Sequence, residues 1–230
     1  MDFRDRHVVI TGGAGALGTA LVGALVEAGA TCHVPCMNEA EAQRFALRAN
    51  QQVKLIVTGS LTDETAVSRL YQPISPLWAS IHLAGGFAAG ALRETSAATI
   101  HQQIDMNLMS CLLCCRAAVT AMAAGGRIVS VAARAALEWR SGAGMVAYTA
   151  SKAAVAALTA ALAEEVAKDG ILVNAVAPSI MDTPANRKSM PKANYDLWPK
   201  VEEVAATIMF LASPENRVTR GAVVPVYGRS

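Results

Sequence analysis

Residues 7–18, HVVITGGAGALG, decide the fold of this chain because a glycine-rich turn joins a strand signal to a helix signal. The β-branched run His7–Thr11 predicts a strand, and Ala16–Ala28, closed by Gly29, predicts a helix. Glycine lets the backbone approach a ligand closely, and a helix N-terminus offers free N–H groups to a pyrophosphate. An ordinary tight turn is the alternative. The residues that we expect to bind a dinucleotide here are Gly12, Gly15, Ala16, Leu17 and Gly18.

Strand and helix signals alternate along the rest of the chain. Right-handed crossovers then give a mostly parallel sheet with helices on both faces. We therefore expect a single-domain, Rossmann-like, doubly wound α/β fold of about seven strands over residues 1–230. The polar, irregular segment 179–200 is expected to be a substrate or lid loop. Further strands are expected at Thr31–Val34, Val53–Val57, Ala79–Leu83, Arg127–Ala132, Ile171–Ala177 and Ala222–Val226, and further helices at Glu39–Asn50, Asp63–Tyr71, Ser96–Asn107, Leu108–Ala123, Val146–Lys168 and Val201–Ala212.

The composition excludes several classes of protein. Hydrophobic residues make up 53% of the chain and charged residues 17%, which excludes a disordered protein. The formal net charge of +2 is too weak to indicate a nucleic-acid partner. No uninterrupted apolar stretch of about 18 residues occurs, so no membrane span is expected, and the charged N-terminus is unlike a signal peptide. The expected compartment is the cytoplasm.

Five cysteines, mostly in apolar segments, are expected to be buried, reduced thiols that behave as small hydrophobic residues. A metal site is the alternative, and none is expected. His82, at the end of a predicted strand, is interpreted as a core or cofactor-edge residue rather than a base.

Tyr148 and Lys152 begin the long predicted helix and lie one turn apart, on one face. A tyrosine can give or take a proton at a substrate heteroatom, but its ordinary pKa of about 10 is too high for easy ionisation. An ammonium group nearby is expected to lower that pKa. The pair therefore predicts general acid–base catalysis beside hydride transfer. Taken alone, this spacing is also common among surface residues.

With these motifs in order, the chain resembles the short-chain dehydrogenase/reductase family over nearly its whole length. The resemblance implies a catalytic tyrosine and lysine at Tyr148 and Lys152, with Lys152 also binding the nicotinamide ribose. It implies that Asn107 helps to organise a proton-relay water. It further implies an NAD or NADP cofactor. The residues expected to contact that cofactor beyond the glycine turn are Ala84, Gly85, Lys152, Pro178 and Thr183.

The chain departs from the family pattern where a catalytic serine is expected. The fifth strand reads Ser130-Val131-Ala132-Ala133, so that Ala133 takes the place of the serine, and Ser130 points to the other face by strand alternation. Ser141, in the following loop, is a candidate substitute. The predicted second strand ends in Val34-Pro35-Cys36-Met37-Asn38, without the acid or arginine that selects NAD or NADP.

One branch of the family, the quinonoid dihydropteridine reductases, also has the tyrosine–lysine pair without the serine. The chain resembles that branch in residues 84–90 and 182–191. The resemblance implies that Phe87 packs near a pterin, in place of a tryptophan. Phe87, Ala133 and Tyr148 are therefore the expected substrate residues. Arg187 and Lys188 can attract an anionic group or simply be solvated, while Trp139 and Trp198 can line the pocket or cap the core.

The leading hypothesis is a reductase that moves hydride from NADH or NADPH to a conjugated, pterin-like small molecule. An ordinary carbonyl reductase or alcohol dehydrogenase is the second. A cofactor-binding regulatory protein with weak catalysis is the third, and Ala133 is the residue that favours it. The family resemblance implies a homodimer or homotetramer.

Overall fold

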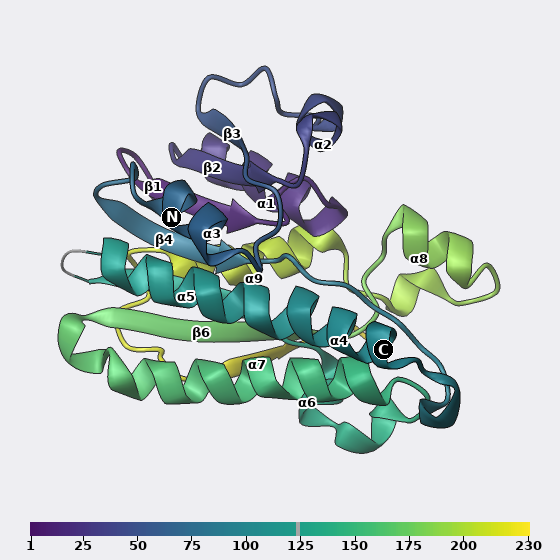
Figure 1. Ribbon diagram of the computed structural model, residues 1–230. Helices are drawn as coiled ribbons and strands as arrows, with labels where there is room; N and C mark the ends of the chain where they lie inside the picture. The colour runs from purple at the N-terminus through teal and green to yellow at the C-terminus, as the bar shows by residue number, and fades with distance from the viewer. Residues whose placement is uncertain (123–124) are drawn as a thin grey trace.

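The computed structural model describes residues 1–122 and 125–230. Its core is one parallel sheet with the strand order β3-β2-β1-β4-β5-β6-β7 (Figure 1). This order confirms the expected single-domain, Rossmann-like α/β fold with seven strands. The strands are β1 His7–Thr11, β2 Thr31–Cys36, β3 Val53–Val57, β4 Leu77–His82, β5 Gly126–Val131, β6 Ile171–Pro178 and β7 Val223–Val226.

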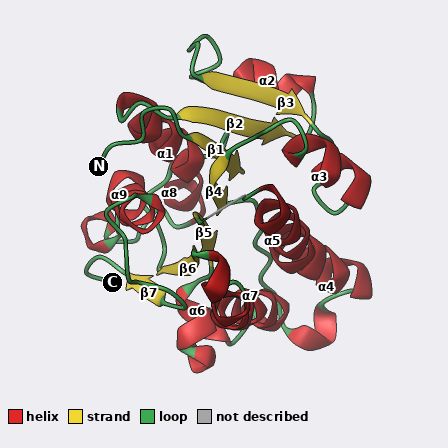
Figure 2. Ribbon diagram, turned by 90° about the vertical axis from the view of Figure 1, so that its left-hand side faces the viewer, coloured by secondary structure: helices red, strands yellow, loops and turns green. Residues whose placement is uncertain are grey.

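The helices form two layers around the sheet, as the end-on view in Figure 2 shows. Each layer packs its own cluster of buried aliphatic side chains against the strands. One face carries α1 Ala16–Glu27 and α9 Val201–Ala212. The other carries α3 Glu64–Tyr71, α4 Ala97–Ile104, α5 Ser110–Ala121 and α7 Val146–Glu165. The shorter helices are α2 Glu39–Arg44, α6 Arg134–Leu137 and α8 Pro184–Ser189.

Strand order reverses between β1 and β4, which are neighbours in the sheet although two strands separate them in sequence. Doubly wound sheets bind ligands at the carboxyl ends of the strands on either side of such a reversal. The glycine turn follows β1 and the segment from Leu83 follows β4. The topology therefore places the predicted cofactor and substrate residues at one edge of the sheet.

Several predicted boundaries shift in the N-terminal half, β4 for example from Ala79–Leu83 to Leu77–His82, and two of the shifts have a clear physical cause. Strand β2 continues through Pro35 to Cys36, where we expected proline to stop it. Within β2, only Thr31–His33 pair with β1, so Pro35 lies beyond the part of β2 that bonds both neighbours. The expected helix Glu39–Asn50 ends at Arg44 because Phe45 turns to extended backbone and is buried.

The expected pair of helices over 96–123 is a continuous helical segment with a π-helical turn at Asp105–Met109 between α4 and α5. Such turns insert a residue into the helix and are frequent at functional sites. The predicted end at Ala123 lies outside the described residues. The expected helix Val146–Lys168 ends at Glu165, and a 3₁₀ turn, Ala167–Asp169, follows it.

Two helical segments, Ala97–Ala121 and Val146–Glu165, are long and apolar enough to cross a membrane by length and composition alone. In this fold both pack against the β sheet and the neighbouring helices (Figure 2).

Candidate active site

The glycine turn is shaped by contacts of backbone with backbone. Gly12 has a φ of 67°, and a Cβ there would lie 2.7 Å from the backbone nitrogen of Ala84. Gly18 sits in the first turn of α1, where a Cβ would lie 2.5 Å from the Cα of Gly13. Gly15 is the N-cap of α1, and no side chain caps that helix. The turn thus brings an uncapped helix N-terminus to the end of β1.

Thr11 holds the glycine turn to the strand beside it. Its hydroxyl accepts a hydrogen bond of 3.2 Å from the backbone N–H of Ala84, and its carbonyl accepts one of 3.1 Å from Leu83. Thr11 is buried. Sequence analysis missed this residue, although its place at the end of the first strand and directly before Gly12 was a usable signal.

Asn107 joins the loop after β4 to α7. Its Oδ1 accepts from the N–H of Gly86 at 2.9 Å, and its Nδ2 donates to the Gly86 carbonyl and to Ser151 Oγ, both at 3.0 Å. A Cβ at Gly85 would lie 2.6 Å from Asn107 Oδ1 and 3.3 Å from Lys152 Nζ. Gly85, Asn107 and Lys152 therefore meet at one point, and Ser151 is a second residue that sequence analysis missed.

Tyr148 and Lys152 lie on the first turns of α7, as predicted. Lys152 is buried, and its Nζ donates a hydrogen bond of 2.7 Å to the carbonyl of Val131 at the end of β5. Burial lowers the pKa of Lys152 to about 8, because the charged form loses hydration.

The expected lowering of the tyrosine pKa does not occur in the structure. Burial raises the pKa of Tyr148 to about 12. The Lys152 amino group is directed to Val131, so loss of hydration dominates over any ammonium charge. A phenol of this kind stays protonated at neutral pH, which suits a proton donor in a reduction better than a base.

The end of β5 presents no hydroxyl on the side of Ala133. Ala133 is buried and is the N-cap of α6, while Ser130 bonds to groups beneath the sheet instead. Ser141 is exposed, and its hydroxyl donates to the carbonyl of Glu138 at 2.7 Å. That bond already occupies the hydroxyl proton of the candidate substitute.

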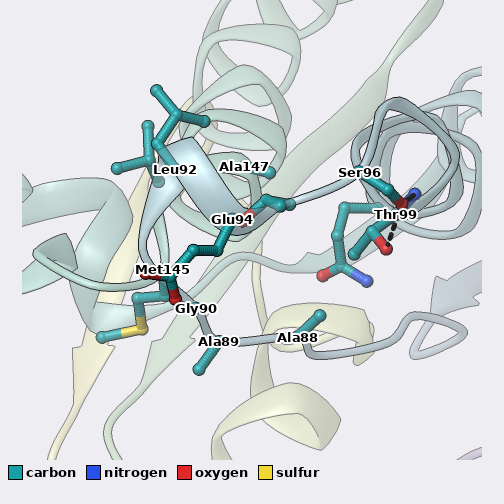
Figure 3. A pocket seen from close by; sticks show the side chains of 12 residues that line it. Ala88, Ala89, Gly90, Leu92, Glu94, Ser96, Thr99, Met145 and Ala147 are labelled. Atoms are coloured by element: carbon teal, nitrogen blue, oxygen red, sulfur yellow. Dashed lines mark hydrogen bonds between the residues drawn. The ribbon is translucent and has the colours of Figure 1, made fainter.

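Phe87 and Tyr148 form an edge-to-face pair, with ring centroids 5.0 Å apart and planes at 79°. Phe87 is 64% exposed and so leaves much of its surface to a ligand. A cavity of about 210 Å³ is lined by Ala88 and Ala147, which adjoin Phe87 and Tyr148 in sequence. Figure 3 shows its walls, which come from residues 88–90, 92, 94–96, 99 and 145–147, and from Gln103 of α4.

The segment 179–200 is more ordered than we expected. Its ends meet, because the N–H of Asp182 donates to the carbonyl of Pro199 at 2.9 Å. Thr183 caps α8 by accepting from the N–H of Asn186 at 3.2 Å, and proline follows it at the first helical position. This threonine–proline pair is a helix-start signal that sequence analysis missed.

Arg187 forms a two-bond ion pair with Asp182, at 2.6 and 2.7 Å, and so is not a free anion site. Trp198 is buried against Tyr195 and caps the core. His82 is buried and is a core residue. Trp139 is 74% exposed, and its indole N–H donates to the carbonyl of Ala136. Neither tryptophan lines the cavity beside Tyr148.

A nicotinamide dinucleotide fits these residues. The Gly12–Gly18 cradle has no room for a Cβ at either end, and the uncapped N-terminus of α1 leaves N–H groups for a pyrophosphate. Lys152 and Thr183 are both nearly buried at the same strand ends. When bound, such a cofactor supplies or accepts the hydride.

The comparisons with known proteins agree with this geometry. Residues 6–194 match the family described as short chain dehydrogenase. Galactitol 2-dehydrogenase of Rhizobium johnstonii is 33% identical, over 96% of this chain and 93% of its own. Cis-4-hydroxycyclohexanecarboxylate dehydrogenase of Sinomonas cyclohexanicum is 32% identical, over 98% and 96%.

Among solved structures, a short chain dehydrogenase of Burkholderia cenocepacia in complex with NADP aligns with a TM-score of 0.86 and 26% identity. The alignment covers 99% of this chain and 98% of that one. The matched family, the relatives' coverage and the strand-end geometry lead to one conclusion: this chain belongs to the short chain dehydrogenase family and is an NAD(P)-dependent oxidoreductase.

Proposed function

We propose that this enzyme reduces a conjugated, pterin-like substrate with NADH or NADPH, and that Tyr148 donates the proton. The observation that carries the proposal is the hydroxyl-free strand end at Ala133, with Ser141 bonded elsewhere. A ketone needs a donor for the alkoxide that forms on its oxygen, which a serine supplies. A conjugated ring system spreads the charge over its own heteroatoms and depends less on that hydroxyl.

In this proposal the residues share the work as follows. The substrate carbon receives the hydride, and a ring nitrogen receives the proton of the Tyr148 hydroxyl. Lys152 binds the cofactor ribose and stabilises the phenolate that remains. Phe87 provides a face for an aromatic ring beside Tyr148. Gln103 is buried in the cavity wall with no partner for its Oε1 among the described residues, and this acceptor suits a substrate bearing N–H groups.

Restoring the hydroxyl tests the proposal. Ala133→Ser should raise kcat/KM for ketones at least tenfold, the effect of a hydrogen bond to a charged group worth about 1.5–3 kcal/mol, and should leave the rate with quinonoid dihydropterin within about threefold. Ala132→Ser is the matched control, because Ala132 is also buried but lies one strand position away. Ketone reduction by the natural enzyme, without pterin turnover in any form, would contradict the proposal.

An ordinary alcohol dehydrogenase or carbonyl reductase is the second candidate. Both relatives named above are dehydrogenases of hydroxyl compounds, which favours it. The same assay with polyols, cyclic alcohols and ketones separates the two candidates. Cofactor binding without turnover of either class would support the third hypothesis, a regulatory cofactor-binding protein.

For the cofactor we propose a preference for NAD. The Glu41 carboxylate folds back to accept the N–H of Met37 at 2.6 Å, directly after β2, where an acidic group repels a 2′-phosphate. Glu41→Gln should raise the affinity for NADPH relative to NADH by about tenfold, the effect of one charge worth about 1.4 kcal/mol. Glu39→Gln, on the exposed first turn of α2, is the control. An unchanged ratio would refute this role of Glu41.

We also propose that 179–200 acts as the lid, since its two ends are joined by the Asp182–Pro199 bond. A homodimer or homotetramer through α4, α5 and α7 is proposed from their long, apolar surfaces. Sedimentation velocity measures the assembly directly, and a concentration-independent monomer would refute it.

A further inference from the structure

A second cluster of chemically active side chains lies beneath the active-site edge and takes no part in the proposed reaction. His82 ends β4, and Ser130 is its direct neighbour on β5. Cys111 and Cys115 lie one turn apart on α5, facing these strands. All four residues are at most 4% exposed. The cluster therefore brings one imidazole, two thiols and one hydroxyl together inside the core.

The spacing within this cluster is that of ligands around one ion. His82 Nδ1 lies 3.7 Å from Cys111 Sγ, 3.5 Å from Cys115 Sγ and 3.4 Å from Ser130 Oγ. Cys111 Sγ lies 3.4 Å from Ser130 Oγ. Tetrahedral zinc, with Zn–S of about 2.3 Å and Zn–N of about 2.0 Å, holds neighbouring ligand atoms about 3.4–3.8 Å apart.

We propose that His82, Cys111 and Cys115 form a closed Zn²⁺ site, with Ser130 Oγ at the fourth position. An imidazole and two thiolates are the nitrogen and sulfur ligands that zinc prefers. The cysteines are buried and free, as expected from the sequence, and the proposal adds a ligand role for two of them. The proposal is independent of the substrate and of the proposed reaction.

The surroundings of His82 orient it for such a role. Its Nε2 is bonded to Ser80 Oγ at 2.8 Å, and Ser80 Oγ to the hydroxyl of Tyr71 at 2.7 Å. With Nδ1 on the ion, the ring proton sits on Nε2 and is donated to Ser80. Outer partners of this kind fix the ring orientation of a metal-binding histidine.

Charge balance favours the ion in this dry environment. Binding replaces two thiol protons, which leave to solvent, with one Zn²⁺ on two thiolates and a neutral imidazole. The loaded site has no net charge, so burial costs little. An ion enclosed in this way loads as the chain folds, because metal binding and folding are coupled.

The test measures metal rather than activity. The full-length protein, unfolded and refolded anaerobically with excess Zn²⁺ and then desalted, should retain one zinc per chain by mass spectrometry of the elements. Refolding with Co²⁺ should give the intense visible bands of tetrahedral thiolate coordination. Cys111→Ser and Cys115→Ser should each lower retention at least tenfold, and Ser130→Ala by less.

Cys114→Ser is the matched control. Cys114 is buried on the same helix but lies outside the cluster, so this variant should retain the full complement of metal. Should the cluster variants fold poorly, the second measurement is the thermal midpoint of natural protein and Cys114→Ser with and without Zn²⁺, which should rise in both. Zinc lost on desalting from the natural protein, or equal retention in all three cysteine variants, would overturn the proposal.

Discussion

The glycine turn and the substrate side of the same sheet edge differ in what determines their shape. At the turn, backbone lies against backbone, and a Cβ at Gly12 or Gly18 would meet main-chain atoms within 2.7 Å. On the substrate side, Phe87 is 64% exposed and stands beside an open cavity. A backbone cradle excludes side chains at its closest contacts, whereas an exposed wall can change its side chains. Lys152 and Asn107 lie between the two.

The largest effect is expected on the substrate side, where the Tyr148 hydroxyl is the proposed proton donor. Tyr148→Phe removes the proton donor but keeps the ring that packs against Phe87. We expect kcat to fall by about 10²–10⁴-fold, the usual contribution of a general acid. Fluorescence titration with NADH should show nearly unchanged cofactor binding, because the hydroxyl bonds no other residue in the described part of the chain. A variant with full rate would show that another group donates the proton.

Lys152 should couple the stability of the fold to pH. Its pKa is lowered from 10.5 to about 8 by burial, so between these values the unfolded chain binds more protons than the folded one. Lys152 therefore makes the free energy of unfolding increase as pH rises from 8 to 10.5. The same free energy decreases again as pH falls back to 8.

Urea unfolding at pH 8 and pH 10 measures this coupling. The free energy of unfolding of Lys152→Gln, minus that of the natural protein, should be higher at pH 8 than at pH 10 by about 2–3 kcal/mol. Lys168→Gln, on an exposed turn after the same helix, should show no such pH dependence. If the two proteins differed in free energy of unfolding by the same amount at both pH values, the pKa of Lys152 would not be lowered in the folded state.

The smallest effect is expected at the glycine turn, and it sharpens the comparison. Gly18→Ala adds a Cβ 2.5 Å from Gly13 Cα, which should lower the free energy of unfolding by about 1–3 kcal/mol and weaken NADH binding. Gly15→Ala is the matched control, since its nearest contact is 3.3 Å and its φ of −77° suits alanine. Equal stability of the two variants would show that the turn is not a close-packed cradle.

The fold was largely predictable because its signals are local. A β-branched strand, a glycine turn and a helix lie within residues 7–18, and the alternation of such units permits little except a doubly wound sheet. The residues at which helices and strands end were harder to predict. Pro35 continues β2 because the pairing of β2 with β1 has already ended at His33, and Phe45 shortens α2 because it turns into the core. Both depend on neighbours that are distant in sequence.

For the active site, sequence by itself determined which residues we expect to carry chemistry: Tyr148 and Lys152 by their spacing, the glycines of the turn, and Ala133 in place of serine. Only the tertiary structure decided what surrounds them. Burial, set by packing from several elements, raises the tyrosine pKa and lowers that of Lys152. The packing of α5 against β4 also brings His82 Nδ1 and Cys111 Sγ within 3.7 Å, although the two residues are 29 positions apart in sequence. Sequence spacing carries no information on such contacts, since they arise from long-range packing.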